Sequence, residues 1–196
     1  ANNCAVVTQN SIIECDSVPG VGKDLRINTV LGDSSTINTV SLAFDSSLSY
    51  VPPQIDQVSG GPLSTVANTE IVVQGLHFGP QNLSPAYLEV AYGTANFLRA
   101  DGLDPASCEV RSDAEIRCDV PPAAGGKNIS LRLSVEGQAI TNAFGIFFAG
   151  LNYLQPIISG VASNDNPMKP GSSTKITLSG SNFGPTGTSN FFSLKY

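Results

Sequence analysis

The sequence predicts an all-β protein made of repeated modules, and three observations support this. Short alternating or β-branched runs recur along all 196 residues, separated by Gly, Pro, Asn and Ser. No apolar pattern with a helical period continues for more than about two turns. The sequence also repeats itself at a separation of about 100 residues. Together these features are typical of β-sandwiches.

The expected strands follow the apolar runs, and turn-forming residues separate them because Gly, Pro, Asn and Ser favour the backbone angles of turns. The strands are expected at 4–8, 11–16, 25–31, 39–45, 55–58, 69–75, 87–92, 107–111, 114–119, 128–135, 143–149, 156–161, 174–180 and 191–196.

Composition excludes several classes of protein. Hydrophobic residues make up 41% and charged residues 13%, which predicts a packed core. The net charge is −6 and no Lys/Arg cluster is present, so a phosphate backbone would be repelled and nucleic acid is not an expected partner. No apolar run approaches the roughly 18 residues of a membrane span. Because Ala1–Cys4 opens the chain without signal-peptide features, any secretion signal or anchor is expected outside this segment.

The four cysteines form two pairs by spacing, Cys4 with Cys15 and Cys108 with Cys118. Each intervening stretch predicts two strands and a turn, so the paired cysteines become cross-strand neighbours that can meet disulfide geometry. Two disulfides predict an oxidising environment, extracellular or at the cell surface. Zinc is the alternative, but a single His and no Cys-x-x-Cys make it the weaker interpretation.

The repeat consists of two matched pairs of stretches. Residues 4–19 match 108–121, because both carry the spaced cysteines and then Asp and Pro. Residues 50–59 match 153–162 and lead into a second motif, Gly-x-x-Phe-Gly. This motif comprises Gly75, Phe78 and Gly79 in one copy and Gly180, Phe183 and Gly184 in the other. Its glycines permit the positive φ that tight turns need, and each Phe is expected to pack inward.

The order of these motifs resembles the IPT/TIG domain. A Pro-rich entry precedes an apolar strand and Gly-x-x-Phe-Gly, and the spaced cysteines and a final strand pair follow. This domain is an immunoglobulin-like fold found in plexins and related receptors, in large protist and algal surface proteins, and beside some enzymes. The resemblance covers essentially the whole chain and implies tandem immunoglobulin-like β-sandwiches.

The repeat divides the chain into one complete module at 53–153 and two half modules. Residues 1–52 match the C-terminal half of a module, and residues 154–196 match the N-terminal half. The halves fit when read in a circle, since Phe191–Tyr196 followed by Ala1–Cys4 supplies a strand, a turn and a cysteine. A half module leaves open sheet edges. Residues 154–196 are therefore expected to be completed by residues 1–52 of the next copy, either covalently or between molecules.

This pattern predicts an extracellular structural protein, the repeating unit of a head-to-tail filament or surface stalk, since a head-to-tail contact stays open unless it closes a ring. The alternative is a spacer or ligand-binding segment of a cell-surface adhesion or receptor ectodomain, as the resemblance to plexin modules implies. An accessory module of a polysaccharide-active enzyme would need a catalytic domain beside it.

Catalysis is not expected. His77 is the only His, lies in the Gly-rich turn and takes the place of Asn182 in the other copy, whereas a Ser or Cys nucleophile needs a partnered base. No cofactor is expected. Calcium bound near Asp165, or near Asp101 and Asp104, remains open, although no EF-hand loop is present.

Attached glycans are expected at two sequons. These are Asn82-Leu-Ser and Asn128-Ile-Ser, and Pro85 directly after the first is expected to reduce its use.

Overall fold

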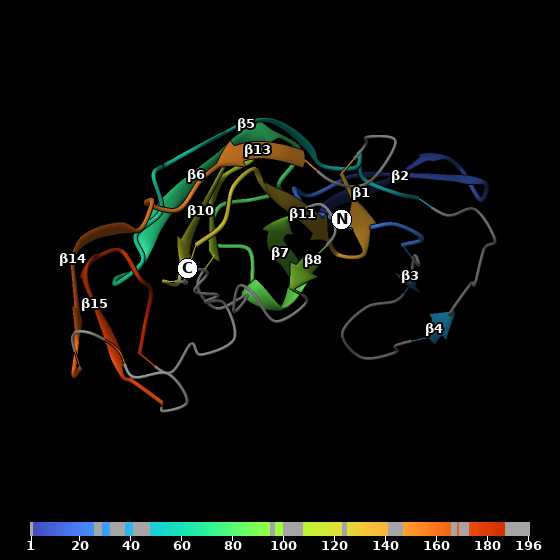
Figure 1. Ribbon diagram of the computed structural model, residues 1–196. Coiled ribbons are helices and arrows are strands. Elements are labelled where there is room, and N and C mark those ends of the chain that lie inside the picture. The colour runs from blue at the N-terminus through green and yellow to red at the C-terminus, as the bar shows by residue number, and fades with distance from the viewer. Residues whose placement is uncertain are drawn as a thin grey trace.

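The protein is all-β in its computed structural model, which confirms that prediction (Figure 1). The structure describes residues 2–25, 29–31, 38–40, 48–94, 97–99, 108–122, 125–140, 147–165, 168 and 173–186. The strands pair antiparallel, and η1 (Pro85–Tyr87) is a single 3₁₀ turn capped by the Ser84 side chain.

Two antiparallel sheets form a central sandwich. The first sheet has the order β5 (Gln54–Ser59), β6 (Thr69–Leu76), β10 (Glu115–Val120) and β9 (Cys108–Ser112). The second has the order β12 (Gln138–Ala139), β11 (Ile129–Val135), β7 (Leu88–Thr94) and β8 (Phe97–Arg99), and β13 (Phe147–Leu151) also pairs with β11.

The hydrophobic core lies between these two sheets. Successive strand residues point to opposite faces, so apolar residues at alternate positions share one buried face. On β6 these are Ile71 and Val73, and on β10 they include Ile116. In the described part of the chain, every buried apolar side chain lies between Pro53 and Tyr153. Each large buried side chain contributes roughly 1.5–3 kcal/mol.

Further strand pairs flank the sandwich. They are β1 (Asn2–Thr8) with β2 (Ile12–Asp16), β3 (Thr29–Leu31) with β4 (Asn38–Val40), and β14 (Ile157–Ser163) with β15 (Ile176–Ser181). We call β1–β2 the N-terminal strand pair and β14–β15 the C-terminal strand pair. Figure 1 shows them on opposite sides of the sandwich, with β14–β15 in orange and red on the left and β1–β2 in blue on the right.

The segment after β2 packs directly on the sandwich. Val21 lies against the core, and a Cβ added to Gly79 would come within 2.4 Å of its Cγ1. The backbone N–H of Gly22 donates to Oε1 of Gln138 at 3.2 Å, and Nε2 of Gln138 donates to the carbonyl oxygen of Tyr50 at 2.8 Å. These contacts connect the segment to the sandwich by both apolar packing and hydrogen bonds.

The structure differs from the predicted strands in a few places. β8 and β12 were not expected, because two or three residues carry too little alternation to predict a strand. β12 follows β11 through a two-residue turn in which Glu136 and Gly137 both have positive φ. Of the expected strand at 25–31, the described residues are Leu25, which forms an isolated bridge with Leu48, and β3 from Thr29 to Leu31. The expected strand at 191–196 lies outside the described residues.

Candidate functional site

The C-terminal strand pair reproduces the pairing of β5 with β6. Val58 lies opposite Val73 in the sandwich, and Val161 lies opposite Leu178 in the strand pair. In both strand pairs the register also shifts at the same place, directly after the residue that lies opposite the first glycine of the Gly-x-x-Phe-Gly motif. The sequence repeat is therefore present in the register of the strands as well.

The first motif glycines, Gly75 and Gly180, occupy equivalent crowded positions. A Cβ added to Gly75 would lie 1.9 Å from the carbonyl oxygen of Gln54. A Cβ added to Gly180 would lie 1.9 Å from the carbonyl oxygen of Ile157. Backbone atoms cannot move away without breaking the strand pairing, so only glycine fits either position.

The rest of the motif also matches between the copies. Gly79 has a φ of +98° and Gly184 a φ of +95°, the left-handed region that favours glycine. The ring of Phe78 is fully buried in the sandwich. The ring of Phe183 folds over Gly180 in the same way but is only half-buried. The two rings differ in burial because core residues of the sandwich surround Phe78.

The N-terminal strand pair reproduces the pairing of β9 with β10. Val6 lies opposite Ile13, as Val110 lies opposite Ile116 in the sandwich. In each pair the strand register shifts directly after this valine. In the N-terminal pair the shift lies between Val6 and Thr8. The first and last strand pairs thus correspond to the two halves of one four-stranded sheet.

Two disulfides close the two cysteine-bearing strand pairs. Cys4 is joined to Cys15 with a Cα–Cα distance of 4.1 Å, and Cys108 to Cys118 with 4.0 Å. Cys108 and Cys118 are buried in the core, whereas Cys4 and Cys15 are exposed. The described residues contain no free cysteine. Two disulfides are typical of an oxidising, extracellular environment.

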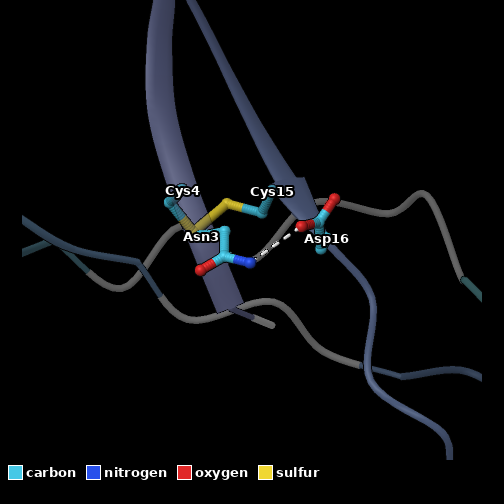
Figure 2. The surroundings of a disulfide bond; sticks show 4 residues. All are labelled: Asn3, Cys4, Cys15 and Asp16. Carbon is cyan, nitrogen blue, oxygen red and sulfur yellow. Dashed lines mark hydrogen bonds between the residues drawn. A yellow bond between two sulfur atoms is a disulfide. The ribbon is translucent and has the colours of Figure 1, made fainter.

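Figure 2 shows that a polar pair lies beside the first disulfide, where Nδ2 of Asn3 donates to Oδ2 of Asp16 at 3.0 Å. Asn3 has a φ of +51° and lies where the pairing of β1 with β2 is irregular. The disulfide and this hydrogen bond together hold the open end of the strand pair closed.

The loops that follow the cysteine strands are also equivalent. The phenol of Tyr50 donates to the carbonyl oxygen of Val18, and the phenol of Tyr153 donates to that of Pro121. The backbone N–H of Tyr50 donates to the carbonyl oxygen of Gly22 at 2.9 Å, and the N–H of Tyr153 donates to the carbonyl oxygen of Gly126 at 3.0 Å. Each Tyr therefore closes the equivalent loop in its own half of the sequence repeat.

The two strand pairs differ from the sandwich in burial. Val6 and Ile13 are 63% and 43% exposed, whereas the corresponding Val110 and Ile116 are 1% and 0% exposed. The C-terminal strand pair shows the same contrast: Ile158 and Leu178 are 56% and 37% exposed, whereas the corresponding Ile55 and Val73 are 9% and 2% exposed. We call the apolar faces that carry these four exposed residues the inner faces. Apolar side chains in this pattern normally face a core, but the described residues do not bury these faces.

His77 lies in a partly buried turn with a φ of +63°, as Asn182 does with +60°. Its Nδ1 is 4.0 Å from Oδ2 of Asp113, whose Oδ1 accepts the backbone N–H of Gly79 at 3.1 Å. Asp113 thus serves to hold the motif turn against the β9–β10 turn.

No group of three or more His, Cys, Asp or Glu side chains that could hold a metal ion occurs in the described residues. Asp101 and Asp104 lie outside them. Within the same part of the chain, no helix is long and apolar enough to cross a membrane.

Both sequon asparagines are exposed and have positive φ, +60° at Asn82 and +53° at Asn128. The backbone N–H of Asn82 donates to the carbonyl oxygen of Val110, and that of Asn128 donates to Oδ1 of Asn152. Both side chains therefore stand on turns that the backbone fixes in place.

A surface ion-pair network crosses the four-stranded sheet. Nε of Arg117 donates to Glu115 at 2.8 Å, and Nη1 lies 3.4 Å from Oε1 of Glu70 on β6. The hydrogen bond and charge of Glu115, followed by the charge of Glu70, raise the pKa of Arg117 above its ordinary value. The link from Arg117 to Glu70 connects β10 to β6, the two strands that meet at the middle of the sheet.

Gln138 is a structural residue that the sequence did not indicate. Its side chain is buried and bridges Gly22 and Tyr50 on the segment that precedes the sandwich. An isolated Gln in a short turn carries no pattern, because its partners are more than 80 residues away and only the fold brings them together.

Comparison with protein-family models finds no family that matches this chain, and comparison with curated proteins finds no match either. The evidence for function therefore comes from the internal repeat and its geometry.

Proposed function

We propose that this chain is the repeating unit of an extracellular head-to-tail filament or surface stalk with a structural, non-catalytic role. Residues 53–153 form a complete immunoglobulin-like module of IPT/TIG type. Residues 154–196 of one copy and residues 1–52 of the next form another module together. The next copy either continues the same polypeptide or belongs to a neighbouring molecule.

The observation that carries this proposal is the match between the strand pairs and the central sheet. In that sheet, β6 and β10 join the two halves through six residue pairs. Their counterparts, β15 and β2, pair on one side only among the described residues. An open strand edge beside an exposed apolar face favours pairing with another strand. The strand that fits β15 is a copy of β2.

The placement of the strand pairs supports assembly between copies. Because β1–β2 and β14–β15 lie on opposite sides of the sandwich, each is available to a different neighbour (Figure 1). A contact between unlike surfaces repeats from copy to copy and extends as a filament unless its rotation closes a ring. The bridge from Gln138 to Gly22 and Tyr50 would hold successive modules in a fixed orientation.

The surface chemistry fits this role. The two disulfides suit an oxidising compartment, and the net charge of −6 disfavours nucleic acid as a partner. Glycans on Asn82 and Asn128 would be carried by exposed turns of the complete module. Partners other than further copies of the chain are not required.

Sedimentation velocity across a concentration series, with electron microscopy of the most concentrated sample, tests the proposal. We expect oligomers that grow with concentration and appear as linear particles. Leu178→Lys places a charge on the inner face of β15 and should abolish them. Val66→Lys is the matched control, because Val66 is exposed on a loop of the sandwich outside the strand pairs. A folded monomer at all concentrations, with both strand pairs ordered, would refute self-completion and favour a receptor spacer.

A further inference from the structure

We infer that the junction between copies has one defined register, in which β15 of one copy pairs antiparallel with β2 of the next, and that a reversed ion pair selects it. This inference rests on the proposed function. It specifies which residues meet and why β2 does not pair with the central sheet instead.

The register follows from the pairing of β10 with β6. There, Ile116 lies opposite Val73, and Cys118 lies opposite Ile71. The corresponding residues in the strand pairs are Ile13 for Ile116, Leu178 for Val73, Cys15 for Cys118 and Ile176 for Ile71. The junction therefore places Ile13 opposite Leu178 and Cys15 opposite Ile176. Both inner faces then lie on the same side of one four-stranded sheet.

The charges at the junction are the reverse of those in the central sheet. In the sandwich, Arg117 on β10 pairs with Glu70 at 3.4 Å. The residue that corresponds to Arg117 is Glu14, and the residue that corresponds to Glu70 is Lys175. An arginine–glutamate pair thus becomes a glutamate–lysine pair with the charges exchanged between the strands. Attraction is retained at the same place in the sheet.

The neighbouring position strengthens this exchange. In the sandwich, Asp119 lies opposite Glu70, and Arg117 offsets these like charges. At the junction, the corresponding Asp16 lies opposite Lys175, so two carboxylates face one ammonium group. Glu14 and Lys175 are exposed and have no ion pair within the described residues. Opposite charges on facing strands favour pairing.

The reversal also disfavours one incorrect pairing. If β2 replaced β10 beside β6, Glu14 would meet Glu70, and these like charges are unfavourable on adjacent strands. If β15 replaced β6 beside β10, Lys175 would meet Arg117 but would also lie opposite Asp119, so repulsion and attraction oppose each other there. The reversed charges thus direct β2 to β15 and away from β6.

A second contact follows from the same correspondence. Leu63 pairs in parallel with Tyr153, because its N–H donates to the carbonyl oxygen of Asn152 and its carbonyl oxygen accepts the N–H of Leu154. The residue that corresponds to Leu63 is Met168, which is exposed, and the residue that corresponds to Tyr153 is Tyr50. Met168 is therefore expected to lie beside Tyr50 of the next copy.

A charge-exchange experiment tests the ion pair. Lys175→Glu and Glu14→Arg should each weaken association between copies by roughly 3- to 10-fold in sedimentation equilibrium at low salt. The double variant Glu14→Arg/Lys175→Glu recreates the charges of the central pair and should restore association. The control is Lys127→Glu, which makes the same charge change on an exposed turn. If the double variant loses as much association free energy as the two single variants lose together, the proposed ion pair between Glu14 and Lys175 is refuted.

Cross-linking tests the register separately. Copies with Ile12→Cys are mixed with copies with Ser179→Cys, at positions that correspond to the facing Glu115 and Gln74. Oxidation should link these copies into dimers, whereas Thr177→Cys in place of Ser179→Cys should link poorly. Linear assembly with efficient linkage at 177 would overturn the register and leave the proposed function standing. Absence of assembly by the unsubstituted chain would overturn both.

Discussion

Gln138 on β12 donates from Nε2 to the carbonyl oxygen of Tyr50 at 2.8 Å, across 88 residues of sequence. Its Oε1 accepts the backbone N–H of Gly22, so one buried amide satisfies a donor and an acceptor on a neighbouring segment. Because a carboxamide is planar, these two hydrogen bonds restrict both the position and the rotation of that segment. The sandwich is thereby connected rigidly to the loop closed by Tyr50.

Gln138→Ala should loosen this connection. The backbone groups of Gly22 and Tyr50 lose their partner in a buried environment, which costs about 1–3 kcal/mol. Hydrogen exchange at the amide of Gly22 should accelerate, while exchange in β6 and β11 stays slow. Gln74→Ala removes the same side chain from an exposed position on β6 and should leave exchange at Gly22 unchanged. Equal acceleration in both variants would contradict the connecting role.

Gly180→Ala should disrupt the C-terminal strand pair. The new methyl group would meet the carbonyl oxygen of Ile157 at 1.9 Å, so the pairing of β14 with β15 must open. We expect association between copies to fall at least about 10-fold, as for a strained core substitution of roughly 1–3 kcal/mol. Thermal unfolding of the sandwich should change little.

The control for that variant is Gly160→Ala on β14, where the nearest atom would be Cβ of Ser179 at an ordinary 3.7 Å. This variant should associate normally. Gly75→Ala creates the equivalent clash with Gln54 inside the sandwich and should instead lower its melting temperature. If Gly160→Ala and Gly180→Ala weaken association equally, crowding at the motif glycine is not the cause.

The two disulfides should differ in their access to a reductant. In dilute protein, a mild phosphine followed by alkylation and mass spectrometry should label Cys4 and Cys15 first. Cys108 and Cys118 are buried, so they should react only as the sandwich unfolds. In denaturant the two pairs should be labelled together, because they close loops of similar length. Equal labelling rates in the folded protein would contradict the difference in burial.

Secretion from a eukaryotic host should attach a glycan to Asn128. Its exposed turn leaves the side chain accessible, and Asn128→Gln should lower the mass by one glycan. Asn82→Gln should have a smaller effect, since Pro85 follows that sequon. Asn68→Gln, at an exposed position outside any sequon, is the control and should leave the mass distribution unchanged. A chain without any glycan at Asn128 would remove this modification from the proposal.

Alternation and spacing were sufficient to predict most of the strands. β6 and β10 carry apolar residues at every second position, and Asn68, Gly79 and Pro121 lie in three of the adjoining loops. The short strands β8 and β12 could not be predicted, because pairing with a neighbour creates them and no alternating pattern is present. Gln138 could not be found for the same reason, since its partners are distant in sequence.

The sequence by itself determined the all-β class, the cysteine pairs and the repeat, because each depends on local periodicity or on spacing along the chain. Tertiary structure alone decided burial. Val110 and Val6 occupy matching positions in matching strand pairs, yet one is in a core and the other is exposed. Burial depends on what packs against a face, and no property of the strand itself records that. The exposure of the inner faces is therefore evident only from the fold.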